Sequence, residues 1–188
     1  MKKKILLLSL IYILILCGVA FIKTWEAPAP SATPQFYARQ LLESKVFKIA
    51  GKYSNGEAIV VSKKDHLLYY CRRGFIVRGD RWGGFVYDFP VPVSLGVNNN
   101  WTPEGEFKVY LKNPQSRYTL FLGFLGLYGI HGAETHLASR LNTRENLDPD
   151  YTYVTLKDRT RGCVAVENRV IRYLYAKVDL NTPVLIMP

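Results

Sequence analysis

The chain has few of the residues from which metal centres and disulfide frameworks are built. Its 188 residues include three cysteines and three histidines, and their spacing matches no zinc-finger pattern. His131 and His136 lack the i, i+4 spacing of helical zinc ligands, and no carboxylate motif accompanies them. We therefore expect neither a metal nor a cofactor.

Nucleic-acid motifs and internal repeats are also missing. The net charge of +10 is compatible with nucleic acid, anionic lipid or an acidic polymer. No helix-turn-helix pattern or RNA-binding aromatic motif is present, so nucleic acid is not an expected partner. The composition is 48% hydrophobic and 13% aromatic, which argues against disorder, and thirteen tyrosines with many Val and Ile runs favour β structure.

Charged residues are absent from positions 5–22, an apolar run that follows three lysines. The run is long for a signal-peptide core and about long enough to span a bilayer. Lysines before the run favour a cytoplasmic N-terminus with the remainder exported. The small residues at 18–20 form a poor cleavage site. We expect an inner-membrane anchor within residues 1–25, and a cleaved signal peptide is the alternative.

Residues 26–48 read as a proline-rich spacer followed by a short amphipathic helix over 36–48. Beyond them, a folded domain is expected over 49–188. The alternation of apolar and polar residues predicts strands at 57–62, 66–71, 74–78, 84–88, 91–95 and 106–111. Helical spacing recurs after Asn168, which is a suitable N-cap.

Cys163 is the candidate nucleophile. It ends the sequence Thr160-Arg161-Gly162-Cys163, in which glycine permits a tight turn and a close approach of a substrate carbonyl to backbone N–H groups. His131 is the candidate base that would accept the thiol proton. Taken singly, a buried cysteine and a core histidine are the alternative interpretations.

Further blocks surround these two residues in a fixed order. They are an apolar hairpin with a basic turn at 58–70, a strand at 90–96, a Thr-Pro-x-Gly-x-Phe sequence at 102–107, Ile-His-Gly at 130–132, the cysteine motif at 160–163, Asn168 and a closing strand at 182–186. This order over residues 49–188 resembles the L,D-transpeptidase catalytic domain family (YkuD-like), whose members cross-link bacterial peptidoglycan.

The resemblance implies a mainly β, β-sandwich-like L,D-transpeptidase fold with one or two short helices, preceded by the membrane anchor helix. It implies an enzyme that acts on peptidoglycan stem peptides through a thioester. Together with the lysines and the apolar run at the N-terminus, it leads us to expect an exported, membrane-anchored protein that is periplasmic or otherwise extracytoplasmic. The implied roles are Cys163 as nucleophile, His131 as general base and acid, and Gly162 as part of the backbone that stabilises the oxyanion. Substrate contacts are implied for Thr160, Arg161 and Gly132.

The chain departs from the family pattern in three places. The interval between His131 and Cys163 is longer than usual, with the excess in the polar stretch 139–150. Arg161 occupies the position where many members have a second histidine. Ala165 stands where cross-linking members usually have arginine, and members with alanine there resemble a branch that includes hydrolases.

Three classes of function therefore remain open. The first is a cysteine transpeptidase, or an L,D-peptidase of the same fold that cleaves wall peptides or wall-protein links. The second is a non-catalytic wall-binding protein. The third is a metal-dependent hydrolase that uses His131, His136 and Cys163. Retention of both His131 and Cys163 favours the first class.

Overall fold

The computed structural model describes residues 34–53, 56–97, 101–132 and 160–188. The chain divides into the units Met1–Glu43 and Ser44–Pro188, and the second unit contains every described strand. The apolar run 5–22, the insertion 139–150 and His136 lie outside the described residues. Within the described part of the chain, no helix has the length and apolar character needed to cross a membrane.

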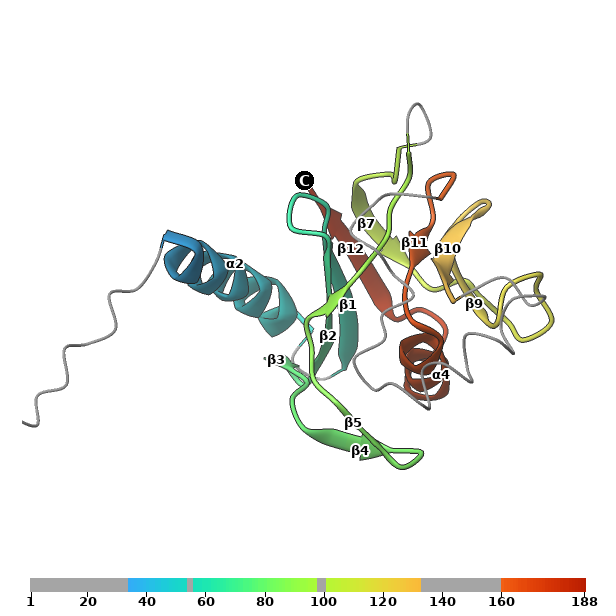
Figure 1. Ribbon diagram of the computed structural model, residues 1–188, viewed down its shortest axis with the longest axis horizontal. Coiled ribbons are helices and arrows are strands. Elements are labelled where there is room, and N and C mark those ends of the chain that lie inside the picture. Colours follow the sequence, from blue (N-terminus) through green and yellow to red (C-terminus); the bar gives the residue numbers. More distant parts are fainter. Residues whose placement is uncertain (1–33, 54–55, 98–100, 133–159) are drawn as a thin grey trace, which may run out of the picture. The chain divides into compact units, whose positions relative to one another are not determined.

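A six-stranded sheet forms one layer of the second unit, with strand order β3-β2-β1-β12-β7 and β6 paired to β2 (Figure 1). Its strands are β1 (Glu57–Ser62), β2 (Leu67–Arg72), β3 (Phe75–Ile76), β6 (Val91–Pro92), β7 (Gly105–Lys108) and β12 (Pro183–Met187). The central strand β1 is buried along nearly its whole length, which agrees with its run of Ala, Ile and Val. It pairs antiparallel with β2 and parallel with β12.

A second, four-stranded sheet has the order β11-β10-β9-β8. Its strands are β8 (Leu111–Asn113), β9 (Phe121–Leu125), β10 (Tyr128–His131) and β11 (Val164–Ala165). Phe107 of the first sheet and Phe124 of the second pack with ring centroids 5.4 Å apart. Helix α4 (Asn168–Lys177) contacts β9 and β10. A separate hairpin is formed by β4 (Asp80–Trp82) and β5 (Phe85–Tyr87).

The expected fold class, mainly β with two helices, is confirmed. The predicted strand 57–62 has the observed bounds of β1. The predicted strand 106–111 is instead two strands, β7 and β8, because the chain leaves the first sheet after Lys108 and joins the second at Leu111. Strands β9 and β10 were not predicted, and glycines at positions 123 and 129 interrupt their apolar pattern.

The two predicted helices are present with shifted boundaries. The helix predicted over 36–48 is α2 (Pro34–Gly51), in which Val46 and Ala50, one turn apart, are buried. Asn168 is not the N-cap of α4. Glu167 occupies that position with extended backbone and makes no side-chain cap, while Asn168 is the first helical residue and is fully buried.

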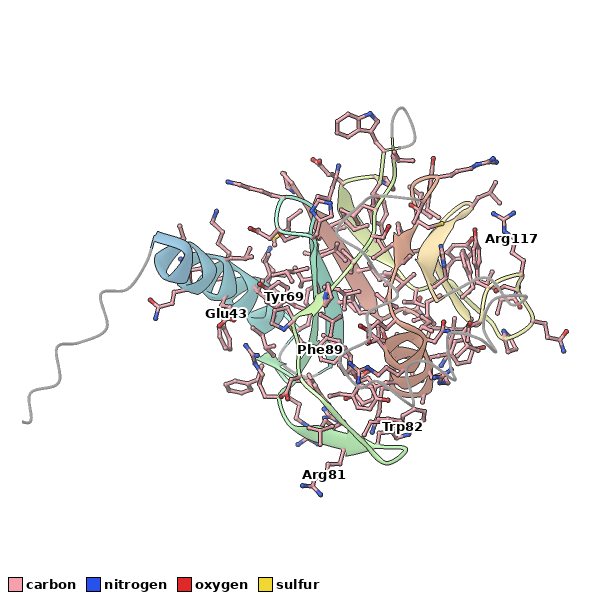
Figure 2. The ribbon with its side chains drawn as sticks, viewed as in Figure 1. Glu43, Tyr69, Arg81, Trp82, Phe89 and Arg117 are labelled. Atoms are coloured by element: carbon pink, nitrogen blue, oxygen red, sulfur yellow. The ribbon has the colours of Figure 1, made fainter. Side chains whose placement is uncertain are left out.

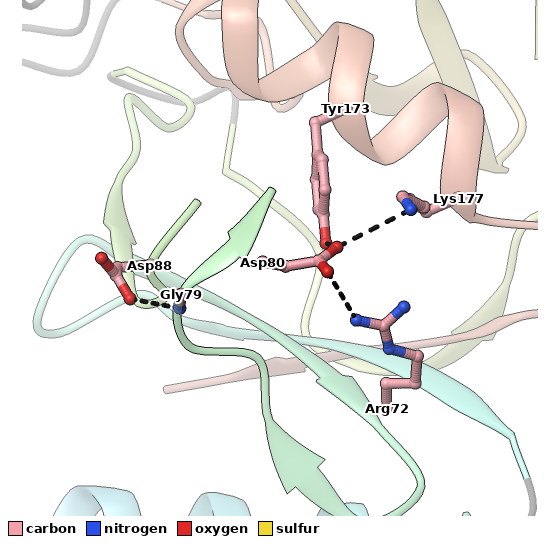
Figure 3. Close-up of polar contacts among 6 residues, drawn as sticks. All are labelled: Arg72, Gly79, Asp80, Asp88, Tyr173 and Lys177. Carbon is pink, nitrogen blue, oxygen red and sulfur yellow. Dashed lines mark hydrogen bonds and ion pairs between the residues drawn. The ribbon is translucent and has the colours of Figure 1, made fainter. Parts of the chain in front are cut away.

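A polar cluster around Asp80 ties α4 to the β4–β5 hairpin (Figure 3). The Tyr173 hydroxyl donates a 2.6 Å hydrogen bond to the Asp80 carboxylate. Arg72 and Lys177 lie 3.3 Å and 3.7 Å from the same carboxylate. These three groups hold the pKa of Asp80 below its usual value, and the Tyr173 hydrogen bond is the largest cause. The Tyr173 ring also stacks on Tyr87 with ring centroids 4.1 Å apart, so α4 is held against the β4–β5 hairpin.

Candidate active site

The parallel pairing of β10 with β11 brings His131 and Cys163 to the same region. Ile130 is paired with Val164, and His131 with Ala165. Extending this register by one residue places Cys163 opposite Gly129, on the same face as His131 and diagonal to it. Strand spacing and rise per residue put their Cα atoms about 8 Å apart. In this structure the Cys163 Sγ and the His131 Nδ1 each contact a backbone carbonyl oxygen, of Leu127 and of Gly132 respectively.

Thr160 closes the turn that precedes Cys163. The Thr160 hydroxyl accepts the Gly162 N–H at 3.2 Å and donates to the Cys163 carbonyl at 2.7 Å. Gly162 has φ +105°, and a Cβ there would overlap the Tyr128 ring and approach the Trp101 carbonyl oxygen to 3.1 Å. Glycine is therefore required at position 162 both by backbone conformation and by space.

Backbone hydrogen bonds hold the turn on both sides of the cysteine. Ala165 exchanges two bonds with Ser94, of 2.8 and 3.0 Å. On the other side, the Thr160 N–H donates to the Leu95 carbonyl at 3.0 Å, and the Val97 N–H donates to the Thr160 carbonyl at 3.1 Å. The cysteine is thus presented from a segment anchored at both ends. Ala165 itself is buried beside His131.

The Cys163 side chain is 8% exposed, and its Sγ lies 3.7 Å from the Leu127 carbonyl oxygen. Burial raises the pKa of the Cys163 thiol, while a hydrogen bond with the backbone of Gly129 and the charge of Arg117 act in the opposite direction. Because burial dominates, the resting group is a thiol, and a base is needed to generate the thiolate.

The His131 imidazole is buried at the end of β10, and its Nδ1 lies 2.7 Å from the Gly132 carbonyl oxygen. A carbonyl can only accept, so this contact assigns the proton of the neutral ring to Nδ1. Nε2 is then the basic nitrogen. Gly132 faces α4, since a Cβ at this position would lie 2.8 Å from Ile171 Cγ2.

Cys163 opens onto a cavity of about 430 Å³. Its lining residues are Arg117, Tyr118, Leu127, Tyr128, Arg161 and Cys163. The two guanidinium groups are the charged groups of this lining, which contains no carboxylate among the described residues. Arg117 projects beside the β9–β10 hairpin (Figure 2). The cavity is therefore suited to a negatively charged, partly apolar ligand.

The predicted site residues do not all reach this cavity. Cys163 and Arg161 line it, whereas the Thr160 hydroxyl is used within the turn. Gly132 is covered by α4. Gly162 shapes the turn, and its N–H donates to Thr160 in this structure.

Four lining residues were missed from the sequence: Arg117, Tyr118, Leu127 and Tyr128. Tyr118 is half-buried and borders the cavity. Arg117 and Tyr118 precede β9 in a turn that has no periodicity to indicate its direction. The glycine turn at 126 was the available signal for Leu127 and Tyr128, because it marks a hairpin tip close to the histidine.

Cys71 is buried on β2, and burial raises the pKa of its thiol to about 12. Cys71 and Cys163 are both free thiols. Within the described ranges, no group of three or more His, Cys, Asp or Glu side chains is arranged to hold a metal ion.

The structure is similar to solved L,D-transpeptidases. One from Mycobacterium tuberculosis is 18% identical, with 71% of this chain and 58% of that chain covered and a TM-score of 0.52. L,D-transpeptidase 3 from the same organism, in complex with a faropenem-derived adduct, is 17% identical, with 71% and 60% covered and a TM-score of 0.53. The enzyme from Mycobacterium smegmatis is 14% identical, with 70% and 58% covered and a TM-score of 0.51.

This chain spans less than two thirds of the length of each of these proteins. At such identities the likeness shows a shared fold. A comparison with curated proteins gives no match. The family model of the L,D-transpeptidase catalytic domain (YkuD) matches residues 56–186, which is more than half of the chain. The chain therefore belongs to the L,D-transpeptidase catalytic domain family.

Proposed function

We propose that this chain is a cysteine-dependent L,D-transpeptidase that acts on peptidoglycan stem peptides through a thioester acyl-enzyme. The observation that carries the proposal is the anchored turn 160–163. It presents the Cys163 thiol to a cavity lined by Arg117 and Arg161, next to the strand that ends in His131. Family membership supports the same conclusion.

Acylation begins when the Cys163 thiol transfers its proton to Nε2 of His131. The sulfur electron pair then forms a bond to the peptide carbonyl carbon, and the carbonyl π electrons move to oxygen. Backbone N–H groups of the turn stabilise this oxyanion. The Gly162 N–H donates to Thr160 in the present conformation, so its participation requires that bond to open. The Cys163 N–H is the other donor in the proposal.

Collapse of the tetrahedral intermediate breaks the carbon–nitrogen bond. His131 returns the proton to the departing amine, which leaves as the downstream amino acid, and the acyl group remains on sulfur as a thioester. An incoming amine attacks this thioester, gives up a proton to His131, and restores the thiol as the new peptide bond forms. Water in place of the amine gives hydrolysis instead of transfer.

Arg161 and Arg117 are the proposed determinants for the charge of the substrate. The cleaved bond of a stem peptide is followed by a D-alanine that ends in a carboxylate. A guanidinium offers two parallel N–H donors that match such a carboxylate. With no acidic side chain among the described lining residues, the attraction is not offset within the cavity.

We also propose an extracytoplasmic location for the enzyme. In this proposal residues 5–22 anchor the chain in the inner membrane, residues 26–48 provide a spacer, and residues 49–188 form the catalytic domain. Proline-rich sequences favour extended conformations, so in this proposal the spacer separates the catalytic domain from the lipid.

A defined stem tetrapeptide tests the proposal directly. The full-length chain is incubated with the tetrapeptide, with and without an amine acceptor, and the products are identified by mass. Release of D-alanine that depends on Cys163 is expected, with cross-linked product when the acceptor is present. Tripeptide alone under both conditions would identify an L,D-peptidase, which the alanine at position 165 favours. No release of D-alanine under either condition would refute the proposed activity.

A further inference from the structure

One face of the His131 ring is covered by an aromatic side chain. The ring of Tyr118 lies parallel to the imidazole, with centroids 3.7 Å apart and an interplanar angle of 16°. The Phe121 ring is also nearly parallel to His131, but its centroid is 6.3 Å away. Tyr118 is therefore in direct face-to-face contact with the imidazole, and Phe121 is not.

Tyr118 is itself held from two sides. Nη2 of Arg117 donates a 2.7 Å hydrogen bond to the Tyr118 hydroxyl, and the guanidinium carbon lies 4.9 Å from the centre of the Tyr118 ring. The Ser116 hydroxyl is 3.1 Å from both the N–H and the carbonyl oxygen of Tyr118. The ring is thus fixed in place by its backbone as well as by its hydroxyl.

Tyr118 lines the cavity onto which Cys163 opens, whereas His131 does not belong to that lining. The tyrosine ring consequently stands between the cavity and one face of the imidazole. Because Nδ1 is bound to the Gly132 carbonyl, Nε2 is the nitrogen that remains for proton exchange, and it is buried in this structure. Stacking on Tyr118 restrains the tilt of the ring edge that carries Nε2.

We propose that Tyr118 is the positioning residue for His131, acting through its ring: it orients Nε2 and stabilises the protonated imidazole by a cation–π contact. This inference rests on the proposed function, in which His131 is the base. The proposed role belongs to the Tyr118 ring, whose hydroxyl oxygen accepts the hydrogen bond from Arg117. An aromatic ring against a desolvated cation favours the charged form.

The elements packed around His131 differ in the charged and titratable groups that they bring near it. Arg117 precedes β9, and Cys163 precedes β11. Glu167 and Arg169, at the start of α4, form an ion pair of 2.8 Å. Strand β9 contributes no titratable residue. Cys163 is the group from which His131 takes a proton in the proposed function, so the test removes it and leaves the imidazole to titrate without that partner.

The test measures the pKa of His131 by NMR in the full-length chain with Cys163→Ala. The resonance is assigned by its loss in a His131→Gln variant. Tyr118→Leu is expected to lower the pKa of His131 by about one unit. Tyr118→Phe keeps the ring and is expected to leave this pKa in place. Phe121→Leu is the matched control, since it removes a neighbouring ring whose centroid lies 6.3 Å from that of the imidazole, against 3.7 Å for Tyr118.

Two results would overturn the inference: an unchanged pKa of His131 in Tyr118→Leu, or an equal shift in Tyr118→Phe. If Tyr118→Leu fails to fold, as judged by thermal melting, Tyr118→Met provides a flexible side chain of similar volume with the same prediction. The measurement needs no substrate, so it stands apart from the proposed activity. Acylation of Cys163 tests that activity independently in the chain with its thiol intact.

Discussion

Substitution of Gly162 by alanine is a sharp probe of the catalytic turn. The backbone at this position has φ +105°, a conformation that costs a non-glycine residue about 1–3 kcal/mol. The added methyl group would also overlap the Tyr128 ring and crowd the Trp101 carbonyl oxygen at 3.1 Å. The turn must therefore carry this strain or move.

Each outcome has a measurable consequence. Strain of about 1–3 kcal/mol lowers the melting temperature by roughly 3–10 °C for a domain of this size. Movement of the turn displaces the thiol, and a misplacement of about 1 Å costs about 100-fold in rate. We expect the rate of Cys163 acylation to fall at least about tenfold, with a lower melting temperature. Stopped-flow fluorescence with a carbapenem and a thermal melt measure the two quantities.

Gly79→Ala is the matched control. Gly79 also has a positive φ, of +63°, but no atom lies within 4 Å of its added Cβ. It precedes the β4–β5 hairpin, away from the cavity. This variant is expected to lose about 1 kcal/mol of stability and to be acylated at the original rate. An acylation rate in Gly162→Ala equal to that of the native chain would contradict the role assigned to Gly162. An equal loss of acylation rate in Gly162→Ala and Gly79→Ala would contradict it as well.

Three further predictions concern the base, the charge of the substrate and the Asp80 cluster. His131→Gln should lower turnover by about 100-fold or more, whereas His66→Asn, at a positive-φ turn position, should have little effect on steady-state kinetics. Arg161→Met should lower kcat/KM about tenfold for a stem tetrapeptide with a free C-terminal carboxylate, and a similar loss with the C-terminal amide would contradict the assignment. Tyr173→Phe removes a hydrogen bond to the Asp80 carboxylate and should cost about 1–2 kcal/mol near neutral pH. That bond lowers the pKa of Asp80 below 3.8, so its contribution is present above this pH and is lost as the pH falls through the folded-state value. The melting temperatures of the native chain and of Tyr173→Phe should therefore converge in acid. A difference in melting temperature that stays constant down to low pH would contradict the role of the Asp80 carboxylate.

The sequence predicted those parts of the fold in which local pattern and burial agree. Strand β1 has the predicted bounds because its apolar run is buried on both faces. Strands β9 and β10 were missed, since Gly123 and Gly129 break the pattern that burial would otherwise impose. Packing leaves little room for a side chain at either position. A Cβ on Gly129 would overlap the Phe121 ring, and one on Gly123 would approach Tyr110 to 3.1 Å.

The candidate site also has a part that the sequence predicted and a part that it did not. Cys163 and His131 were predicted as a pair because their motifs are short and occur in a fixed order, and the structure places β10 beside β11. The contact of Tyr118 with His131 joins residues from a turn and a strand end, and no periodicity relates the two positions. Asn168 was expected at the N-cap, but its side chain accepts a 3.1 Å hydrogen bond from Thr119. That tertiary contact replaces the local one.

The central claim is that Cys163 is a nucleophile that forms a covalent acyl-enzyme. Intact mass of the full-length chain after exposure to a carbapenem tests it most directly. A single adduct of the mass of the carbapenem is expected on the native chain, and none on Cys163→Ala, which retains Cys17 and Cys71. Peptide mapping should place the modification on Cys163. An unmodified native chain, or an adduct that persists in Cys163→Ala, would contradict the account.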